Sequence, residues 1–397
     1  MEKELFSVIV LCYRKFEFVY EAIDSVLKQK YSNIELIVSD DGSDEFPEEK
    51  ILNFIKANKK ENISRVIINH EKKNLGTVRH LNHAQTLANG KYVVFLAADD
   101  RFYDENVLEK YCDNFAGEEP ECVIEMAHTA MCDYTLKEIQ GYYLQPEIEK
   151  LLKTGGKQLY EALAYKPYLP STSTCFKKEF FKKYGAFDER YYLVEDVPMH
   201  LRLAREGWKI HYANFVAIKH RTGGISHGNI GGLSRTGYLY LCDLYNIKKY
   251  EVEPYYSFMS KDTRREIRQV RRHEMRNWGY DKYVYEHNTK EILKLTLRYP
   301  GFMFGKVIGQ KFNKLENVWR KWIRVGVFLG IFSTLLKIAM EIMMQEGLLA
   351  WKVSEGMLVL ISSGLIYTGG IVAVFAGISR MLLKIEWFPE ECLIGNC

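Results

Sequence analysis

The sequence contains little proline and no C-x-x-C pair of cysteines. Only nine of its 397 residues are proline and 47% are hydrophobic. This composition argues against a disordered chain, and a length of 397 residues is sufficient for two domains. The eight cysteines are scattered, without the C-x-x-C pairs that are typical of zinc sites. We therefore expect reduced thiols in a cytosolic compartment.

The sequence also has no strong net charge, and we expect no signal peptide. The 55 Lys and Arg residues against 51 Asp and Glu residues give a formal charge of +4. That excess is too small to indicate nucleic-acid binding, so no nucleic-acid partner is expected. The first five residues, Met1 to Leu5, lead directly into an apolar run without the features of a secretory signal.

The first apolar run is not followed by G-x-G-x-x-G, which argues against a dinucleotide-binding dehydrogenase. Four apolar, β-branched runs nevertheless alternate with helical stretches. The runs cover 6–11, 34–39, 65–69 and 92–97, and the helical stretches lie near 16–29, 47–58 and 77–89. This alternation predicts βαβ units and a mainly parallel sheet.

The pattern is less regular beyond residue 100. We predict helices over 104–116, 176–184 and 196–206, the last two ending at Gly185 and Gly207, and strands over 122–128 and 209–218. The polar stretch 133–156 has little periodicity and is expected to include a loop that closes over a ligand.

Two of the predicted strands end in aspartates. Asp40-Asp41-Gly42-Ser43 follows the second run, and Asp99-Asp100 follows the fourth. The carboxyl ends of strands form the ligand crevice of an open α/β sheet, where carboxylates can hold a divalent cation against a nucleotide diphosphate. Turn formation is the alternative, because Asp-Gly sequences are common in turns.

The order and spacing of several blocks resemble family 2 glycosyltransferases, over roughly residues 5–228. The blocks are 7–14 (SVIVLCYR), 22–29 (AIDSVLKQ), 34–43 (IELIVSDDGS), Asn74-Leu75-Gly76 with Asn82, 90–92 (GKY), 97–100 (AADD), 185–189 (GAFDE) and 194–196 (VED). The resemblance implies a GT-A type fold that transfers a sugar from a nucleotide-sugar donor with inversion at the anomeric carbon.

The resemblance also implies roles for individual residues. Asp196 matches the catalytic base, and Asp99, Asp100 and His220 match ligands of a divalent metal, Mn²⁺ or Mg²⁺. The donor-binding positions implied are Val10, Cys12, Tyr13, Asp41, Asn74, Gly76, Asn82, Asp99 and Glu195. Asp41 is expected to bind the nucleotide base, and Val10 to Tyr13 to line the nucleotide pocket. Ala97 departs from the family, where many relatives have the first Asp of Asp-x-Asp.

Position alone leaves two of these roles open. Glu195 and Asp196 lie where a predicted helix begins, and acidic residues favour the first turn of any helix. A single histidine such as His220 is more often a structural hydrogen-bonding group than a ligand. The glycines after it, Gly223 and Gly224, would let backbone amides approach phosphate oxygens.

The rest of the chain is expected to be helical and membrane-associated. Residues 231–315 are rich in tyrosine and contain six closely spaced arginines, which suit anionic lipid headgroups or the phosphate of a lipid-linked acceptor better than nucleic acid. They are Arg264, Arg265, Arg268, Arg271, Arg272 and Arg276. A solvated helix face is the alternative.

Residues 316–397 contain two candidate membrane segments. The segment 357–378 has no charged residue and is long enough to span a bilayer. The segment 323–344 carries Lys337 and Glu341, so it either spans or lies along the interface. Basic residues flank the pair on both sides, which predicts a hairpin in the cell inner membrane with the catalytic domain in the cytoplasm.

Together these observations predict a GT-A domain over 1–230, with a nucleotide-binding half (1–110) and an acceptor half (111–230), followed by the helical region and the membrane hairpin. The expected function is inverting transfer of a hexosyl or N-acetylhexosaminyl group, with a UDP-sugar favoured as donor. The expected acceptor is a glycan or lipid-linked glycan in bacterial cell-surface polysaccharide synthesis. Homo-oligomers are possible.

Two related kinds of glycosyltransferase are less well supported by the sequence, and one protein of a different class remains an alternative. No Gln-x-x-Arg-Trp motif of processive synthases is present, and Arg101-Phe102-Tyr103-Asp104 differs from the block that polyprenyl-phosphate mannose synthases carry after their aspartates. The alternative of a different class is a membrane-tethered binding or scaffold protein that has kept the fold and lost catalysis.

Overall fold

The structure, a computed structural model, describes residues 3–117, 122–143, 146–166, 169–222, 234–299 and 302–303. The chain divides into two compact units, 1–287 and 288–397. In the second unit the structure describes helix α11 (Thr289–Arg298). Both candidate membrane segments, 323–344 and 357–378, lie outside the described residues. None of the described helices is both long and apolar enough to span a bilayer.

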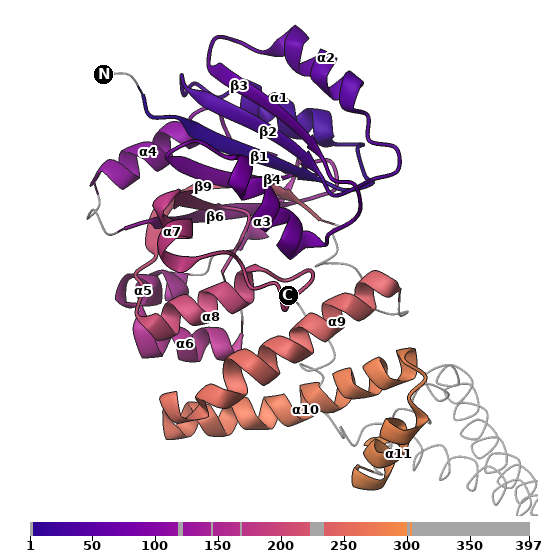
Figure 1. Cartoon of the computed structure of the whole chain (residues 1–397). Coiled ribbons are helices and arrows are strands. Elements are labelled where there is room, and N and C mark those ends of the chain that lie inside the picture. Colours follow the sequence, from indigo (N-terminus) through magenta and orange to yellow (C-terminus); the bar gives the residue numbers. More distant parts are fainter. Residues whose placement is uncertain are drawn as a thin grey trace, which may run out of the picture. The chain divides into compact units, whose positions relative to one another are not determined.

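A nine-stranded sheet forms the centre of the first unit (Figure 1). Its strands are β1 (Phe6–Cys12), β2 (Ile34–Asp40), β3 (Ile63–His70), β4 (Tyr92–Ala97), β5 (Arg101–Phe102), β6 (Ile124–Cys132), β7 (Ile139–Tyr142), β8 (Thr174–Lys177) and β9 (His211–Arg221). The order is β3-β2-β1-β4-β8-β6-β9-β5, with β7 paired to β6. The strands β3, β2, β1 and β4 are parallel, as predicted, whereas β8 is antiparallel to both of its neighbours.

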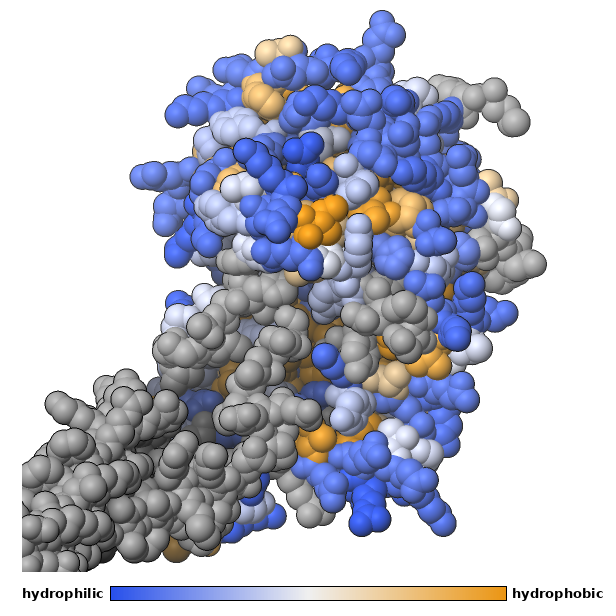
Figure 2. Space-filling model, turned by 180° about the vertical axis from the view of Figure 1, so that it is seen from behind, coloured by the Kyte–Doolittle hydropathy of each residue, from blue (hydrophilic) through white to orange (hydrophobic). Residues whose placement is uncertain are grey.

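Helices cover both faces of this sheet. They are α1 (Val19–Leu27), α2 (Glu48–Asn58), α3 (Thr77–Leu87), α4 (Val107–Gly117), α5 (Pro146–Thr154), α6 (Gly156–Tyr165), α7 (Glu179–Tyr184) and α8 (Asp196–Glu206). Side chains alternate along β1, so Val8 and Val10 pack with α1, α2 and α4, whereas Ile9 packs with α3 on the opposite face. Among the described residues, the surface seen in Figure 2 is mostly hydrophilic, with small hydrophobic patches.

The helical region after the sheet packs onto the same unit. It comprises α9 (Arg235–Ile247), the π-helical turn η2 (Lys248–Val252), the 3₁₀ segment η3 (Glu253–Phe258) and α10 (Lys261–Tyr285). Ile247, Val252, Met259 and Ile267 are buried in one apolar cluster with residues of α6 and α8. The residues of this region up to α10 therefore share the core of the α/β part.

Two predictions of secondary structure were wrong in detail. The helix expected from 176 begins only at Glu179, because Thr174–Lys177 form β8 between β4 and β6. The strand expected to end at 218 continues to Arg221, so His220 lies within β9 and not in the following loop. The stretch 133–156 contains β7 and α5.

Candidate functional site

The acidic strand ends lie at the point where the strand order reverses. From β1 the chain proceeds to β2 and β3 on one side, and then returns to β4 on the other side of β1. In register, Cys12 of β1 is opposite Asp40, and Leu11 is opposite Ala97. Asp41 and Asp99 therefore extend from strands on either side of β1, at the position where open α/β sheets bind their ligands.

Asp41 organises the loop before α3. Its carboxylate accepts hydrogen bonds from Asn74 Nδ2 at 2.8 Å, from the backbone nitrogen of Leu75 at 2.7 Å and from that of Gly76 at 3.1 Å. Burial, and secondarily the neighbouring carboxylates, raise the pKa of Asp41 to about 6 despite these donors. Asp41, itself a predicted donor-binding residue, thus holds two others, Asn74 and Gly76. The predicted contact of Asp41 with a nucleotide base stays a prediction.

The same loop contacts the segment that leads to the predicted base. Gly76 has a φ of +85°, and a Cβ at this position would lie 2.6 Å from the ring of Tyr192. The hydroxyl of Tyr192 donates a hydrogen bond to Asn74 Oδ1. The backbone carbonyl of Tyr192 accepts one from the backbone nitrogen of Val78 at 3.3 Å. Only glycine combines this backbone conformation with so close an aromatic ring.

Asp243 of α9 fixes the other side of this segment. Its carboxylate, which is 3% exposed, accepts hydrogen bonds from the backbone nitrogens of Tyr192 at 2.9 Å, Leu193 at 2.6 Å and Val194 at 3.1 Å. Burial raises the pKa of Asp243 although three amides favour the ionised form. The chain entering Glu195 is therefore anchored by a buried carboxylate from the helical region.

Glu195 and Asp196 lie at the N-terminus of α8 and are partly exposed. The nitrogen of Val197 donates to Asp196 Oδ1 at 2.7 Å. Desolvation raises the pKa of both carboxyls, and the charge of Asp196 raises that of Glu195 further, while hydrogen bonds to Ser171 work in the opposite direction. A carboxylate with a raised pKa is a better proton acceptor at neutral pH than an ordinary aspartate.

The turn after β4 is fixed by the end of β9. Asp100, which is buried, accepts from His220 Nδ1 at 2.8 Å and from the backbone nitrogen of Arg221 at 3.0 Å. Arg221 Nε donates to the carbonyl of Asp99 at 3.0 Å, Nη2 donates to Glu21, and the guanidinium stacks 3.5 Å from the ring centroid of Phe18. The structure thus brings Asp99, Asp100 and His220 together, as predicted.

The Asp99-Asp100 turn has carboxylates that could bind a cation, but few of them. Burial of the His220 imidazole opposes its charged form, but the carboxylates of Asp100 and Asp99 outweigh this effect and raise the pKa of His220. Burial and the charge of Asp100 raise the pKa of Asp99. Within the described part of the chain, no group of three or more His, Cys, Asp or Glu side chains is arranged to hold a metal ion.

These residues fit a divalent cation that takes most of its ligands from a substrate. Mg²⁺ is commonly held by one or two carboxylates, with phosphate oxygens and water completing its shell. Asp99 is partly exposed at the strand end, whereas both oxygens of Asp100 already accept hydrogen bonds. Asp99 is therefore the better protein ligand of the predicted set.

Other predicted residues have structural partners. Val10 and Cys12 are buried in β1, where the Cys12 thiol donates to the carbonyl of Ser39 at 3.4 Å, while Tyr13 is 37% exposed at the strand end. Asn82 is buried and exchanges two hydrogen bonds with the backbone of Phe187, at 2.9 and 2.8 Å. Asn82 thus joins α3 to the block at 185–189, and its predicted contact with the donor stays a prediction.

Two residues of this site were missed from the sequence. Arg221 follows His220 directly, but nothing local marked it as the residue that clamps the Asp99-Asp100 turn. Asp243 is a single acid in the apolar stretch Tyr238 to Leu244. A charge on the buried face of an amphipathic helix is unusual without a partner, which is the signal that could have identified it.

Comparisons with known proteins agree with the predicted family. Residues 7–163 match the model of the family described as glycosyl transferase family 2. The prediction of a family 2 glycosyltransferase domain is thereby confirmed for these residues. Asp196, His220 and Asp243 lie beyond the matched residues.

Individual relatives are similar over part of their length. GlyG, a glycosyltransferase of Streptococcus pneumoniae, is 30% identical over 30% of this chain and 38% of its own. The glucosyltransferase WfaP of Escherichia coli is 35% identical over 24% of this chain and 36% of its own. This chain thus spans less than two fifths of either relative. A crystal structure of Staphylococcus aureus TarS, residues 1–349, has a TM-score of 0.47 at 13% identity, covering 71% of this chain and 91% of TarS.

Proposed function

We propose that this chain, which carries a family 2 glycosyltransferase domain over residues 7–163, transfers a sugar from a nucleotide-sugar donor to an acceptor hydroxyl with inversion. One observation carries the proposal. The acidic ends of β2 and β4 flank β1 at the strand-order reversal, inside the region that matches the family. Carboxylates and backbone amides at such a position suit a nucleotide diphosphate.

In this proposal the donor diphosphate lies against the Asp99-Asp100 turn. Asp99 would hold a divalent cation, Mn²⁺ or Mg²⁺, with Asp100 and His220 supporting the turn. When bound, such a cation supplies positive charge that stabilises the leaving diphosphate. Asp41 and the loop 74–76 would hold the nucleotide end, since they form the adjoining part of the same edge.

Asp196 is the proposed general base. It takes the proton of the acceptor hydroxyl while that oxygen forms a bond to the anomeric carbon. The bond between this carbon and the donor diphosphate breaks on the opposite face, and the nucleoside diphosphate leaves with the electron pair. The raised pKa and partial exposure of Asp196 support this role.

The donor and acceptor are proposed by class. The name of WfaP describes transfer of glucose from UDP-glucose to a GlcNAc-diphosphoundecaprenol. This relative supports a UDP-hexose or UDP-N-acetylhexosamine as donor and a glycan or lipid-linked glycan in cell-surface polysaccharide synthesis as acceptor.

A nucleotide-sugar panel and two variants test the proposal. The true donor should raise the melting temperature of the purified protein, because ligands that bind only the folded state stabilise it. Asp196→Asn should keep this shift and lose transfer, since the amide cannot accept a proton. Asp99→Ala should weaken donor binding in Mn²⁺ but change it little in chelator. Transfer by Asp196→Asn within a few-fold of wild type would disprove its role.

Loss of catalysis is the second candidate, favoured by Ala97 at the position where many relatives have aspartate. A membrane-tethered binding or scaffold protein would bind nucleotide sugar without turning it over. Slow, metal-stimulated release of nucleoside diphosphate from the donor discriminates the two, because only a working site hydrolyses it.

We also propose that segments 323–344 and 357–378 attach the enzyme to the inner membrane as a hairpin, with the catalytic domain in the cytoplasm. The apolar length of 357–378 and the basic flanks support this arrangement. In intact cells, Cys392 and Cys397 should then resist a membrane-impermeant thiol reagent and react after permeabilisation. Labelling from outside would contradict the hairpin and indicate a single membrane span.

A further inference from the structure

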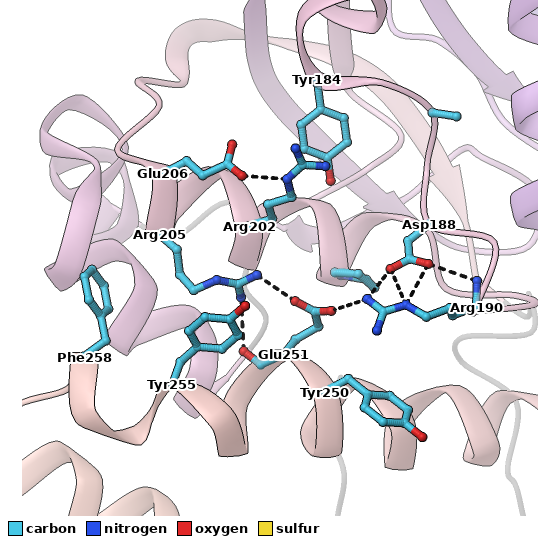
Figure 3. Close-up of a pocket in the computed structure, with 12 residues that line it drawn as sticks. Tyr184, Asp188, Arg190, Arg202, Arg205, Glu206, Tyr250, Glu251, Tyr255 and Phe258 are labelled. Carbon is cyan, nitrogen blue, oxygen red and sulfur yellow. Dashed lines mark hydrogen bonds and ion pairs between the residues drawn. The ribbon is translucent and has the colours of Figure 1, made fainter.

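A concave site in the first unit is lined by none of the strand-end residues. It is a pocket of about 650 Å³ between α8, the stretch Tyr184 to Arg190 and the segment Tyr250 to Phe258 (Figure 3). Pro198, Arg202 and Arg205 line it from α8, where they share one helix face at i, i+4 and i+7. Asp196 begins the same helix but lies off that face, so the pocket is distinct from the candidate catalytic site.

The volume is that of a ligand site and the base of the pocket is ordered by buried charges. Pockets for small organic ligands measure roughly 300–1,000 Å³. At the base, Glu251 (7% exposed) pairs with Arg205 (12% exposed) at 2.8 Å. The rim is open, because the side chains of Arg190 and Arg202 are 56% and 42% exposed.

Each of the three arginines that line this pocket is already paired. Arg190 binds Glu251 at 2.9 Å and Asp188 at 2.8 Å, and Arg202 binds Glu206 at 2.7 Å. With Arg205 on Glu251, three positive side chains face three negative ones, as Figure 3 shows. A phosphate or diphosphate would have to displace a carboxylate and would meet the repulsion of the other two. The pocket is therefore a poor anion site.

Aromatic rings lie between these charges. The guanidinium of Arg205 stacks 3.9 Å from the ring centroid of Tyr255, that of Arg202 lies 4.3 Å from Tyr184, and that of Arg190 lies 5.5 Å from Tyr250. Tyr250 and Tyr255 remain 40% and 36% exposed, so part of their apolar surface is available to a ligand. A purely hydrocarbon ligand would cover this surface only by desolvating six charged groups, which is costly.

We infer that this pocket binds a neutral glycan segment. Sugar hydroxyls both donate and accept hydrogen bonds, so they can add to carboxylates and guanidinium groups without breaking the existing pairs. Arg190, for example, uses Nε and Nη2 in its ion pairs and not Nη1. The C–H faces of the sugar rings would pack on Tyr250 and Tyr255.

This inference rests on the proposed function in one respect: the glycan in the pocket would be part of the acceptor or of the product chain. Because the pocket is on another face of α8 than Asp196, it would hold sugar units distant from the reacting hydroxyl. Loss of the pocket should therefore raise KM for long acceptors, leave kcat unchanged, and leave short acceptors unaffected.

Binding can be tested without transfer. The full-length protein is titrated calorimetrically with maltotetraose, cellotetraose and chitotetraose, and with a heparin-derived tetrasaccharide as the anionic probe. The critical variant is Tyr250→Ala, and Tyr165→Ala is its control, because Tyr165 is 48% exposed on α6 and does not line the pocket. At least one neutral probe should bind, and Tyr250→Ala should weaken it about tenfold, with no change in Tyr165→Ala.

Three results would overturn the inference: no binding of any neutral probe, tighter binding of the heparin fragment than of every neutral probe, or equal weakening in the two variants. A second variant, Asp188→Asn, should also weaken the neutral probe and guards against misfolding of the first. UDP titrated in parallel reports on the strand-end site, so a failure of the proposed function is recognised separately.

Discussion

The Oδ2 atom of Asp243 lies 2.6 Å from the backbone nitrogen of Leu193, two residues before Glu195. A helix outside the residues that match the family thus holds the chain that presents the proposed base. Two adjacent amides donate to the same carboxylate. We therefore treat Asp243 as a positioning residue, one that acts on the reaction through Asp196.

Asp243→Asn should lower kcat about tenfold or more. The NH₂ group of asparagine would face backbone N–H groups, so at least one buried hydrogen bond would be lost. Such a loss costs about 1–3 kcal/mol. The Kd for the donor should change less than kcat. Steady-state kinetics and donor titration measure the two effects. Asp113→Asn on the exposed side of α4 is the control, and unchanged kcat in folded Asp243→Asn would contradict the assignment.

Asp41→Asn should weaken donor binding and stability together. The carboxylate accepts three hydrogen bonds from residues 74–76, and an amide can accept only through its single oxygen. We expect a loss of about 1–3 kcal/mol in the free energy of unfolding, measured by denaturant titration. Asp44→Asn provides the matched control because the Asp44 side chain is 92% exposed. Equal effects in the two variants would argue against an organising role for Asp41.

Gly76→Ala should be destabilising by about 1–3 kcal/mol, since alanine disfavours a φ of +85° and its Cβ would lie 2.6 Å from the Tyr192 ring. Gly117→Ala, where nothing lies within 4 Å of the added Cβ, should have little effect. A double-mutant cycle with Tyr192→Ala separates the two causes. Removal of the ring should recover part of the loss, and strict additivity would show that only the backbone conformation matters.

Arg221→Lys should reduce donor affinity, although the charge is retained. Lysine lacks the planar fork that reaches the Asp99 carbonyl and Glu21 at once, and it stacks less well on Phe18. Nucleotide titration in the presence of Mn²⁺ gives the readout. In Arg79→Lys, whose side chain is 59% exposed, affinity should stay within a few-fold of wild type.

Hydrophobic periodicity sufficed for the parallel half of the sheet, because β1, β2 and β4 are mostly apolar and are buried at nearly every position. It failed at β8, where four residues run directly into the amphipathic α7. It also failed at the end of β9, whose polar residues 219–221 belong to the strand only because β5 and β6 pair with them. Pairing partners distant in sequence leave no local signal.

The candidate site, like the fold, was predictable only in part from the sequence. The aspartates at strand ends followed from the strand pattern and the family resemblance, and the structure brings Asp100 and His220 into contact. Asp243 and Arg221 act through contacts with segments about 50 and 120 residues away in the chain, and such contacts depend on tertiary packing. Local sequence therefore identified the groups at the strand ends but not the residues that hold them in place.

The pH dependence of transfer tests the pair at the start of α8. A general base works when ionised, so activity should fall as the pH drops through the pKa of Asp196. Desolvation raises this pKa, and the acidic limb of kcat/KM should therefore lie above the ordinary aspartate range of about 4. The pKa of Glu195 is raised further by the charge of Asp196, so near neutral pH the pair is expected to share one proton that resides mainly on Glu195.

Glu195→Gln should consequently keep the acidic limb close to its wild-type position, because glutamine resembles the protonated glutamic acid that is expected at residue 195 at that pH. Glu195→Asp, which keeps a titratable group but shortens its reach, should instead move it. Donor binding measured over the same pH range separates ionisation of the base from loss of the nucleotide. An acidic limb near pH 4 in the wild-type enzyme would contradict the raised pKa of Asp196. A large shift of the limb in Glu195→Gln would place the shared proton elsewhere than on Glu195.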